Sequence, residues 1–185
     1  MNQNLWAAIS AIGGAISAVA ACAAIWHSRK AGKETIESQR PYFVLEAPGI
    51  KHLPNSPTFR VQLTLHNAGG RVATSLEGRI FMTTKQPGVK PKLDLTFSVA
   101  NEIPPHSPTP WYEDAQQLLE KDPEHYVLLG IKYSDPVLNV HYKQLFCMRW
   151  AGVQNGKFHP DFVHVSKEER QQIETKYRPI VSAYI

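Results

Sequence analysis

The stretch FRVQLTLHNAGG, residues 59–70, decides the fold of the larger part of this chain. Residues 59–66 alternate strictly between apolar and polar side chains. Successive side chains of a β-strand point to opposite faces, so this pattern predicts an antiparallel strand with one buried face. Residues 67–70 then predict a turn, because asparagine and glycine tolerate a positive φ angle.

Short segments of the same kind, rich in β-branched and aromatic residues, lie on both sides of this strand. We expect further strands over residues 42–46, 76–83, 93–99, 126–133 and 144–152. Asp135-Pro136 predicts the turn between the last two strands, and Asn155-Gly156 predicts a further turn. Many short strands separated by turn residues, without the βαβ alternation of a parallel sheet, predict a mainly β domain, an antiparallel sandwich, over residues 41–185.

A proline-rich connection, residues 104–110, interrupts the series of strands, and we expect no regular structure there. Residues 111–121 follow it and place Trp111 and three other apolar residues on one helical face. We therefore expect a short helix over residues 111–121.

The C-terminal segment predicts another helix. Ser166 is a suitable N-cap, and Glu169 three residues later completes a capping box. This helix should end near Tyr177, because Pro179 disfavours the helical conformation in the residue before it. The apolar tail, residues 180–185, is expected to add an edge strand to this sheet or to that of a neighbouring molecule.

The stretch LHNAG, residues 65–69, followed by Ala73, resembles the strand–turn–strand segment N-x-G-x-x-x-A of immunoglobulin-like bacterial modules. The wider layout is similar to a group of mostly uncharacterised small bacterial proteins that are anchored by one membrane span. The similar features are Arg40-Pro41 before the first strand, Tyr133-Ser134-Asp135, and the aromatic-rich strand FCMRW at residues 146–150. The resemblance covers most of the chain and departs where Gly70-Arg71 replaces a more usual Thr-Pro. It implies an immunoglobulin-like fold and a bacterial origin, and it implies no activity.

The first part of the chain has another composition, since residues 1–26 contain no Asp, Glu, Lys or Arg. As a helix, Leu5–Trp26 would extend for about 33 Å, enough to cross the hydrocarbon core of a bilayer. Trp6 and Trp26 lie near its ends, where indole rings favour the membrane interface. We expect a transmembrane helix over residues 1–26. The alternatives are a buried helix and a cleaved signal, which the absence of a preceding basic residue and the apolar residues after Cys22 disfavour.

Residues 27–40 are polar and predict a juxtamembrane helical stalk that ends at Pro41. Arg29, Lys30 and Lys33 follow the expected span directly, and no basic residue precedes it. By the positive-inside rule, the N-terminus lies outside and residues 41–185 lie in the cytoplasm.

Small residues gather on one side of the expected span. Ser10, Gly13, Gly14, Ser17 and Ala21 fall on one face at about 100° per residue, opposite a heptad-like stripe of larger apolar residues. A spacing of four between small side chains lets helix backbones approach closely. This pattern has two interpretations. One is that copies of the chain associate through this face, and the other is that the spacing arises by chance in an alanine-rich helix.

The chain has no recognised catalytic or metal-binding motif. Its 8 histidines form no HExxH pattern and its 2 cysteines no CxxC pattern. His159 and His164, with Asp161 between them, are a weak candidate for a metal site, and Arg60 with His66 matches a loose spacing found in some ribonucleases. Ordinary surface side chains are the favoured interpretation of both. We predict no enzymatic activity, no cofactor and no metal.

Charge does not favour a nucleic-acid partner, because residues 41–185 hold 16 Lys and Arg against 14 Asp and Glu without a basic stripe. Trp111, Tyr112 and Tyr142 are instead candidates for contacts with a protein partner, since aromatic residues dominate interface energetics. We expect a membrane-anchored module that tethers or scaffolds partners at the bacterial inner membrane and forms homo-oligomers through its helix. The alternative is an oligomeric pore-type effector, similar in layout to small membrane accessory proteins of antiphage systems.

Overall fold

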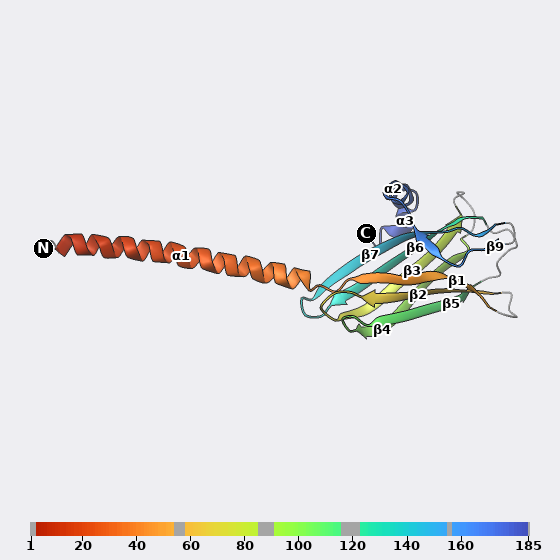
Figure 1. The fold of residues 1–185 in the computed structure, drawn as a ribbon, viewed down its shortest axis with the longest axis horizontal. Helices are drawn as coiled ribbons and strands as arrows, with labels where there is room; N and C mark the ends of the chain where they lie inside the picture. Colours follow the sequence, from red (N-terminus) through yellow and green to blue (C-terminus); the bar gives the residue numbers. More distant parts are fainter. Residues whose placement is uncertain (1–2, 54–57, 85–90, 116–122, 155–156, 185) are drawn as a thin grey trace. The chain divides into compact units, whose positions relative to one another are not determined.

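The computed structural model describes residues 3–53, 58–84, 91–115, 123–154 and 157–184, without the side chains of residues 3–12, 15, 16, 100 and 115. The chain divides into two compact units, Met1–Arg40 and Pro41–Ile185. The first unit consists of one helix, α1, Gln3–Ser38 (Figure 1). The prolines all lie at position 41 or later, so nothing interrupts the helical hydrogen bonds of this alanine-rich segment before Pro41.

The second unit is mainly β, and its sheets are antiparallel, as the alternation of residues 59–66 predicted (Figure 1). One sheet has the order β1-β2-β5, formed by Phe43–His52, Phe59–Asn67 and Pro108–Ala115. The other has the order β10-β7-β6-β3-β4, formed by Phe162–His164, Val140–Trp150, His125–Asp135, Ala73–Thr84 and Leu93–Ile103. A small hairpin pairs β8, Val153–Gln154, with β9, Lys157–Phe158.

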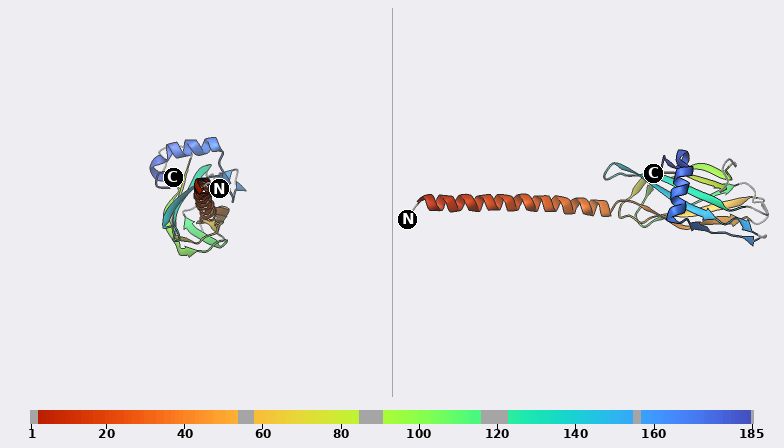
Figure 2. Two further views of the ribbon diagram at one scale, coloured as in Figure 1. Left: turned by 90° about the vertical axis from the view of Figure 1, so that its left-hand side faces the viewer. Right: turned by 90° about the horizontal axis from the view of Figure 1, so that it is seen from above.

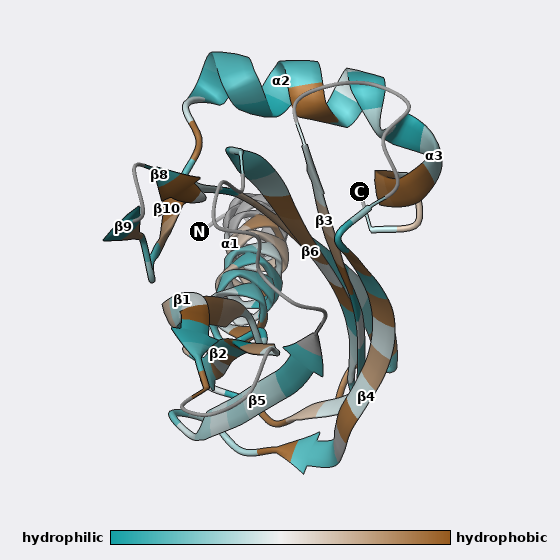
Figure 3. Ribbon diagram, turned by 90° about the vertical axis from the view of Figure 1, so that its right-hand side faces the viewer, coloured by the Kyte–Doolittle hydropathy of each residue, from teal (hydrophilic) through white to brown (hydrophobic). Residues whose placement is uncertain are grey.

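The two larger sheets pack face to face and share one apolar core (Figure 3). Strand β2 buries every second side chain along its length, as its sequence pattern requires. Buried contributions from both layers include Phe43, Leu63, Ile80, Leu129 and Trp150. The prediction that Trp150 belongs to the core is confirmed: its side chain is fully buried, and its indole N–H donates to the carbonyl of His159.

The prediction of a helix over residues 111–121 is wrong for residues 111–115, the part that the structure describes. Residues 108–115 form β5, which pairs with β2 and places Trp111 opposite Leu63. This pairing satisfies a row of backbone groups on β2, a long-range gain that the local apolar spacing does not reveal. Prolines at 108 and 110 are compatible with a strand because β5 lies at the edge of its sheet. Residues 116–122 of the predicted helix lie outside the described residues.

The turn after β2 forms through a side chain and not through positive φ angles, which neither Gly69 nor Gly70 adopts. Asn67 is fully buried, and its Oδ1 accepts a hydrogen bond of 3.1 Å from the Gly69 N–H. Its Nδ2 donates to the carbonyls of Arg71 at 2.8 Å and Ile103 at 3.1 Å. The turn predicted at Asp135-Pro136 also forms, whereas Asn155-Gly156 lies outside the described residues.

Helix α2, Lys167–Lys176, begins with the predicted capping box. The backbone N–H of Glu169 donates to Ser166 Oγ at 3.2 Å, and the N–H of Ser166 donates to Glu169 Oε2 at 3.3 Å. Two N–H groups that the first helical turn leaves without partners are thereby satisfied.

The C-terminal tail is not the predicted edge strand. Residues Arg178–Val181 form a second short helix, α3, and Pro179 occupies its first turn, where a missing N–H costs nothing. The apolar residues of α2 and α3 cover the outer face of the five-stranded sheet, where Phe81, Leu128 and Cys147 form a second buried cluster with Ile173 and Val181 (Figure 2). Burial against this face explains why the tail is helical, a long-range contact that the sequence does not show.

The first residues of the second unit form hydrogen bonds with side chains of the five-stranded sheet. The side-chain amide of Gln144, on β7, accepts from the Phe43 N–H and donates to the Phe43 carbonyl, both at 2.9 Å. The hydroxyl of Tyr133 lies 3.2 Å from the Pro41 carbonyl and 3.0 Å from Gln144 Oε1. Because Phe43 also pairs with Asn67 in β2, the start of β1 is held by both layers.

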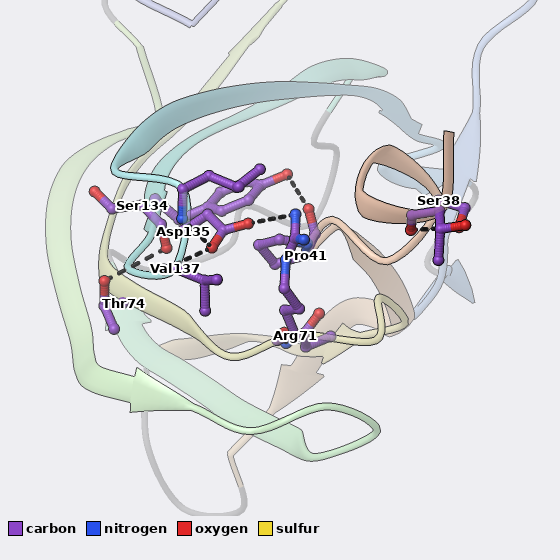
Figure 4. Close-up of polar contacts among 11 residues, drawn as sticks. Ser38, Pro41, Arg71, Thr74, Ser134, Asp135 and Val137 are labelled. Atoms are coloured by element: carbon purple, nitrogen blue, oxygen red, sulfur yellow. Dashed lines mark hydrogen bonds and ion pairs between the residues drawn. The ribbon is translucent and has the colours of Figure 1, made fainter. Parts of the chain in front are cut away.

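A buried ion pair lies near this point (Figure 4). Asp135 is fully buried, and its Oδ2 lies 2.7 Å from Nη2 of Arg71. The Oδ1 atom of Asp135 accepts from the backbone N–H of Val137 at 2.9 Å and forms the predicted turn. Removing either charged partner would leave the other buried alone, which makes the pair a structural requirement of this fold.

Candidate functional site

The histidine and arginine candidates are separated from one another. Arg60 forms a bidentate pair with Asp114, at 2.6 and 3.0 Å, while His66 lies 3.3 Å from Glu46. The hydrogen bonds from Arg60 lower the pKa of the Asp114 carboxyl, and those to Asp114 raise the pKa of Arg60. Each side chain therefore has its own surface partner, and the geometry supplies no shared phosphate site. No group of three or more potential metal ligands, whether with His159 and His164 or elsewhere, gathers among the described residues.

The three aromatic candidates for a partner surface lie in different environments. Tyr112 is 61% exposed on the outer face of β5, with the Arg60 guanidinium 4.5 Å from its ring centroid. Trp111 points the other way and packs against Phe97, with ring centroids 4.7 Å apart. Tyr142 is half-buried beside Tyr133, at a centroid distance of 5.7 Å. Of the three, Tyr112 presents an exposed ring, and the assignment of a partner to them stays a prediction.

The candidate helix-packing residues lie on α1. Gly13, Gly14, Ser17 and Ala21 are exposed within the first unit, and the side chain of Ser10 lies outside the described residues. A methyl group added at Gly13 or Gly14 would meet no atom within 4 Å. The Ser17 hydroxyl donates to the Gly13 carbonyl at 2.9 Å, so its polar group is satisfied within the helix. This face is therefore open to another helix.

The candidate membrane-interface residues follow the same helix. The side chain of Trp6 lies outside the described residues, whereas Trp26 is 60% exposed, and the Lys30 ammonium lies 5.7 Å from its ring centroid. Arg29 and Lys33 are exposed as well. Among the residues that the structure describes, no helix is both long and apolar enough to span a bilayer.

A groove of about 510 Å³ lies beside β7, between this strand and the C-terminal segment. Five consecutive residues of β7, 143–147, line it. His164 borders it where β10 ends, and Arg170 of α2 and Tyr184 complete its wall. Lys143 and Arg170 contribute basic side chains to the groove, which no motif in the sequence indicated, because its parts lie on three separate elements.

Cys147 lies in the floor of this groove but is not a nucleophile. Burial raises the pKa of its thiol to about 11. The thiol is therefore protonated at neutral pH, whereas thiolate is the reactive form.

Comparison with known proteins gives little to add. No protein-family model and no curated protein matches the chain. Among solved structures, it is similar to Northeast Structural Genomics Consortium target SoR45, with 15% identity over 70% of this chain and 97% of that one, and a TM-score of 0.40. Beta-glucosidase 3B from Thermotoga neapolitana is 14% identical over 67% of this chain and 17% of that one, with a TM-score of 0.27. At these scores neither likeness carries an argument.

Proposed function

We propose that this protein is a non-enzymatic binding and assembly module, held at the bacterial inner membrane by α1. The observation that supports the anchor is that the described large apolar side chains of α1 are exposed. Val19 is 71% exposed, Ile25 54% and Trp26 60%, and α1 is the only element among the described residues of the first unit. Apolar side chains that a helix leaves exposed gain from lipid or from other chains around them.

The second unit supports the binding part of the proposal. Sheets ordered β1-β2-β5 and β7-β6-β3-β4 follow the strand arrangement of an immunoglobulin-like sandwich, an architecture that many binding domains use. Arg29, Lys30 and Lys33 support a cytoplasmic location for this domain under the positive-inside rule. The domain presents an open groove and paired surface charges.

Vesicle flotation of the full-length chain tests the anchor. We expect the protein to float with vesicles and to resist extraction with alkaline carbonate. Recovery in the soluble fraction would overturn the proposal.

Assembly through α1 has a matched pair of variants. Gly14→Leu adds bulk to the small-residue face within the expected span, and Gly32→Leu adds the same bulk further along the same helix. If the helices pack through the small face, Gly14→Leu reduces the mass of the detergent-solubilised particle and Gly32→Leu does not. A monomeric wild type would exclude assembly and with it the pore-type alternative.

A further inference from the structure

Strand β7 is paired on its outer side along only part of its length. Strand β10 pairs with it at Trp150, Arg149 and Met148, and the N–H of Val165 then donates to the Cys147 carbonyl at 3.4 Å. Among the described strands, none pairs with β7 on its outer side over residues 140–146. This stretch is therefore an open sheet edge, about 20 Å long at 3.3 Å per residue.

The groove described above lies along this open edge. Where β10 ends at His164, the chain turns away from β7 to α2 (Figure 3), and the lining of the groove includes His164 and Val165. Its volume of about 510 Å³ and its floor of five consecutive strand residues fit an extended peptide segment. An added strand would bond to the backbone of β7, and its alternate side chains would face the groove.

The charges of the groove select the kind of segment. Lys143 stands directly opposite Lys132 in the β6–β7 register, an unfavourable arrangement of like charges. No described carboxylate forms an ion pair with Lys143, while Glu174 is 2.7 Å from Arg170 and so already paired. Glu77, the neighbour of Lys132 in β3, makes no ion pair within 4 Å of it among the described residues. A carboxylate entering beside Lys143 would relieve this repulsion.

We propose that the edge of β7 over residues 140–146 binds an extended, acidic segment of a protein partner, which adds as a strand with a carboxylate against Lys143. A second copy of the chain is a poorer occupant, because edge-to-edge pairing would bring two lysine-bearing strands together. The inference names the partner class of the proposed binding function and does not depend on the membrane anchor.

The test uses the full-length chain in detergent micelles and a fluorescent peptide of alternating glutamate and valine. A peptide of alternating lysine and valine is the control ligand. Lys143→Glu reverses the charge in the groove, and Lys51→Glu makes the same change of net charge on an exposed residue of β1. Fluorescence anisotropy measures affinity, and hydrogen–deuterium exchange locates the bound strand.

We expect the acidic peptide to bind, the basic peptide not to bind, and Lys143→Glu to weaken binding about tenfold or more while Lys51→Glu leaves it within about twofold. Amides of residues 140–146 should gain protection from exchange. The inference is overturned if the acidic peptide does not bind, if both variants weaken it equally, or if protection appears on another strand.

Two further controls keep the test decisive. If Lys143→Glu loses its near-ultraviolet circular dichroism, Lys143→Gln is used in its place. Lys143→Gln should also weaken binding of the acidic peptide, but by a smaller factor. If Lys143→Gln makes the chain self-associate, the lysine only guards the edge against pairing, and the inference fails. Flotation of the same chain after detergent removal in the presence of vesicles reports separately on the anchor, so peptide binding without flotation refutes only the membrane proposal.

Discussion

The two units of this chain differ in how far their apolar side chains are buried. In Pro41–Ile185 they are buried in a core shared by two sheets, where Phe59, Leu65 and Ile80 are fully enclosed. In Met1–Arg40 the described ones, such as Val19 and Ile25, are exposed. At about 25 cal/mol per Å² of apolar surface, burial stabilises the second unit from within, whereas these described side chains of the first unit bury little surface within it.

Substitutions in the two units should therefore affect membrane partition and unfolding separately. A change in α1 should alter partition and assembly without altering the unfolding of the β unit. A change in the core should do the reverse.

The largest effect on the first unit is expected from a charge within the apolar part of α1. Val19→Arg should cost about 2.5–3.5 kcal/mol of insertion free energy near the centre of a span, comparable to the total that the apolar residues of this helix provide. We expect loss of flotation with vesicles and an unchanged denaturation midpoint for the β unit. Ile36→Arg, on the same helix beyond the expected span, is the matched control and should float normally. Equal flotation of the two variants would refute the anchor.

Trp150→Ala should produce the largest effect in the second unit. Removing this fully buried indole leaves a cavity, and such changes cost about 3–5 kcal/mol. Chemical denaturation followed by tyrosine and tryptophan fluorescence measures the loss. Val163→Ala, 55% exposed on β10, is the control and should change the free energy of unfolding by about 0.5 kcal/mol or less. If Trp150→Ala also abolished flotation, the two units would not be independent.

The thiol of Cys147 offers a pH-dependent measurement confined to the second unit. Its pKa of about 11 means that the folded state holds the proton more tightly than the unfolded state does. The corresponding stabilisation is complete below about pH 9 and is lost as the pH rises towards 11. On a Cys22→Ser background, maleimide labelling at pH 8 should be about a hundredfold slower than for an unperturbed thiol and should recover in denaturant. Labelling at the ordinary rate would show that the cluster around Cys147 is open.

These contrasts also show how far the sequence predicts the structure. The alternation of residues 59–66 and the capping box at Ser166 are local signals, and both were confirmed. The strand at Trp111 and the helix at Arg178–Val181 depend on what lies across the fold, namely β2 and the outer face around Leu128. The groove beside β7 was missed for the same reason, because Lys143 and Arg170 are brought together only by tertiary structure.

A more moderate effect is expected where the tail crosses the sheet. A Cβ atom at Gly130 would lie 2.3 Å from the ring of Tyr184, so Gly130→Ala should displace that ring and cost about 1–3 kcal/mol. Tyr184→Ala removes the obstacle, and the double variant should therefore lose less stability than the sum of the two single variants. Strict additivity in denaturation would show that the tail does not pack on Gly130.

The smallest effect is expected at the start of α2. Ser166→Ala removes the hydroxyl that accepts from the Glu169 N–H and should cost about 1 kcal/mol. Because Ile173 still fastens the helix to the sheet, the loss should appear first as faster hydrogen exchange of the Glu169 amide, before any shift in global unfolding. Ser166→Asp keeps an acceptor at the cap and should restore slow exchange. If alanine and aspartate behave alike, the cap contributes nothing, and α2 is held only by its contacts with the five-stranded sheet.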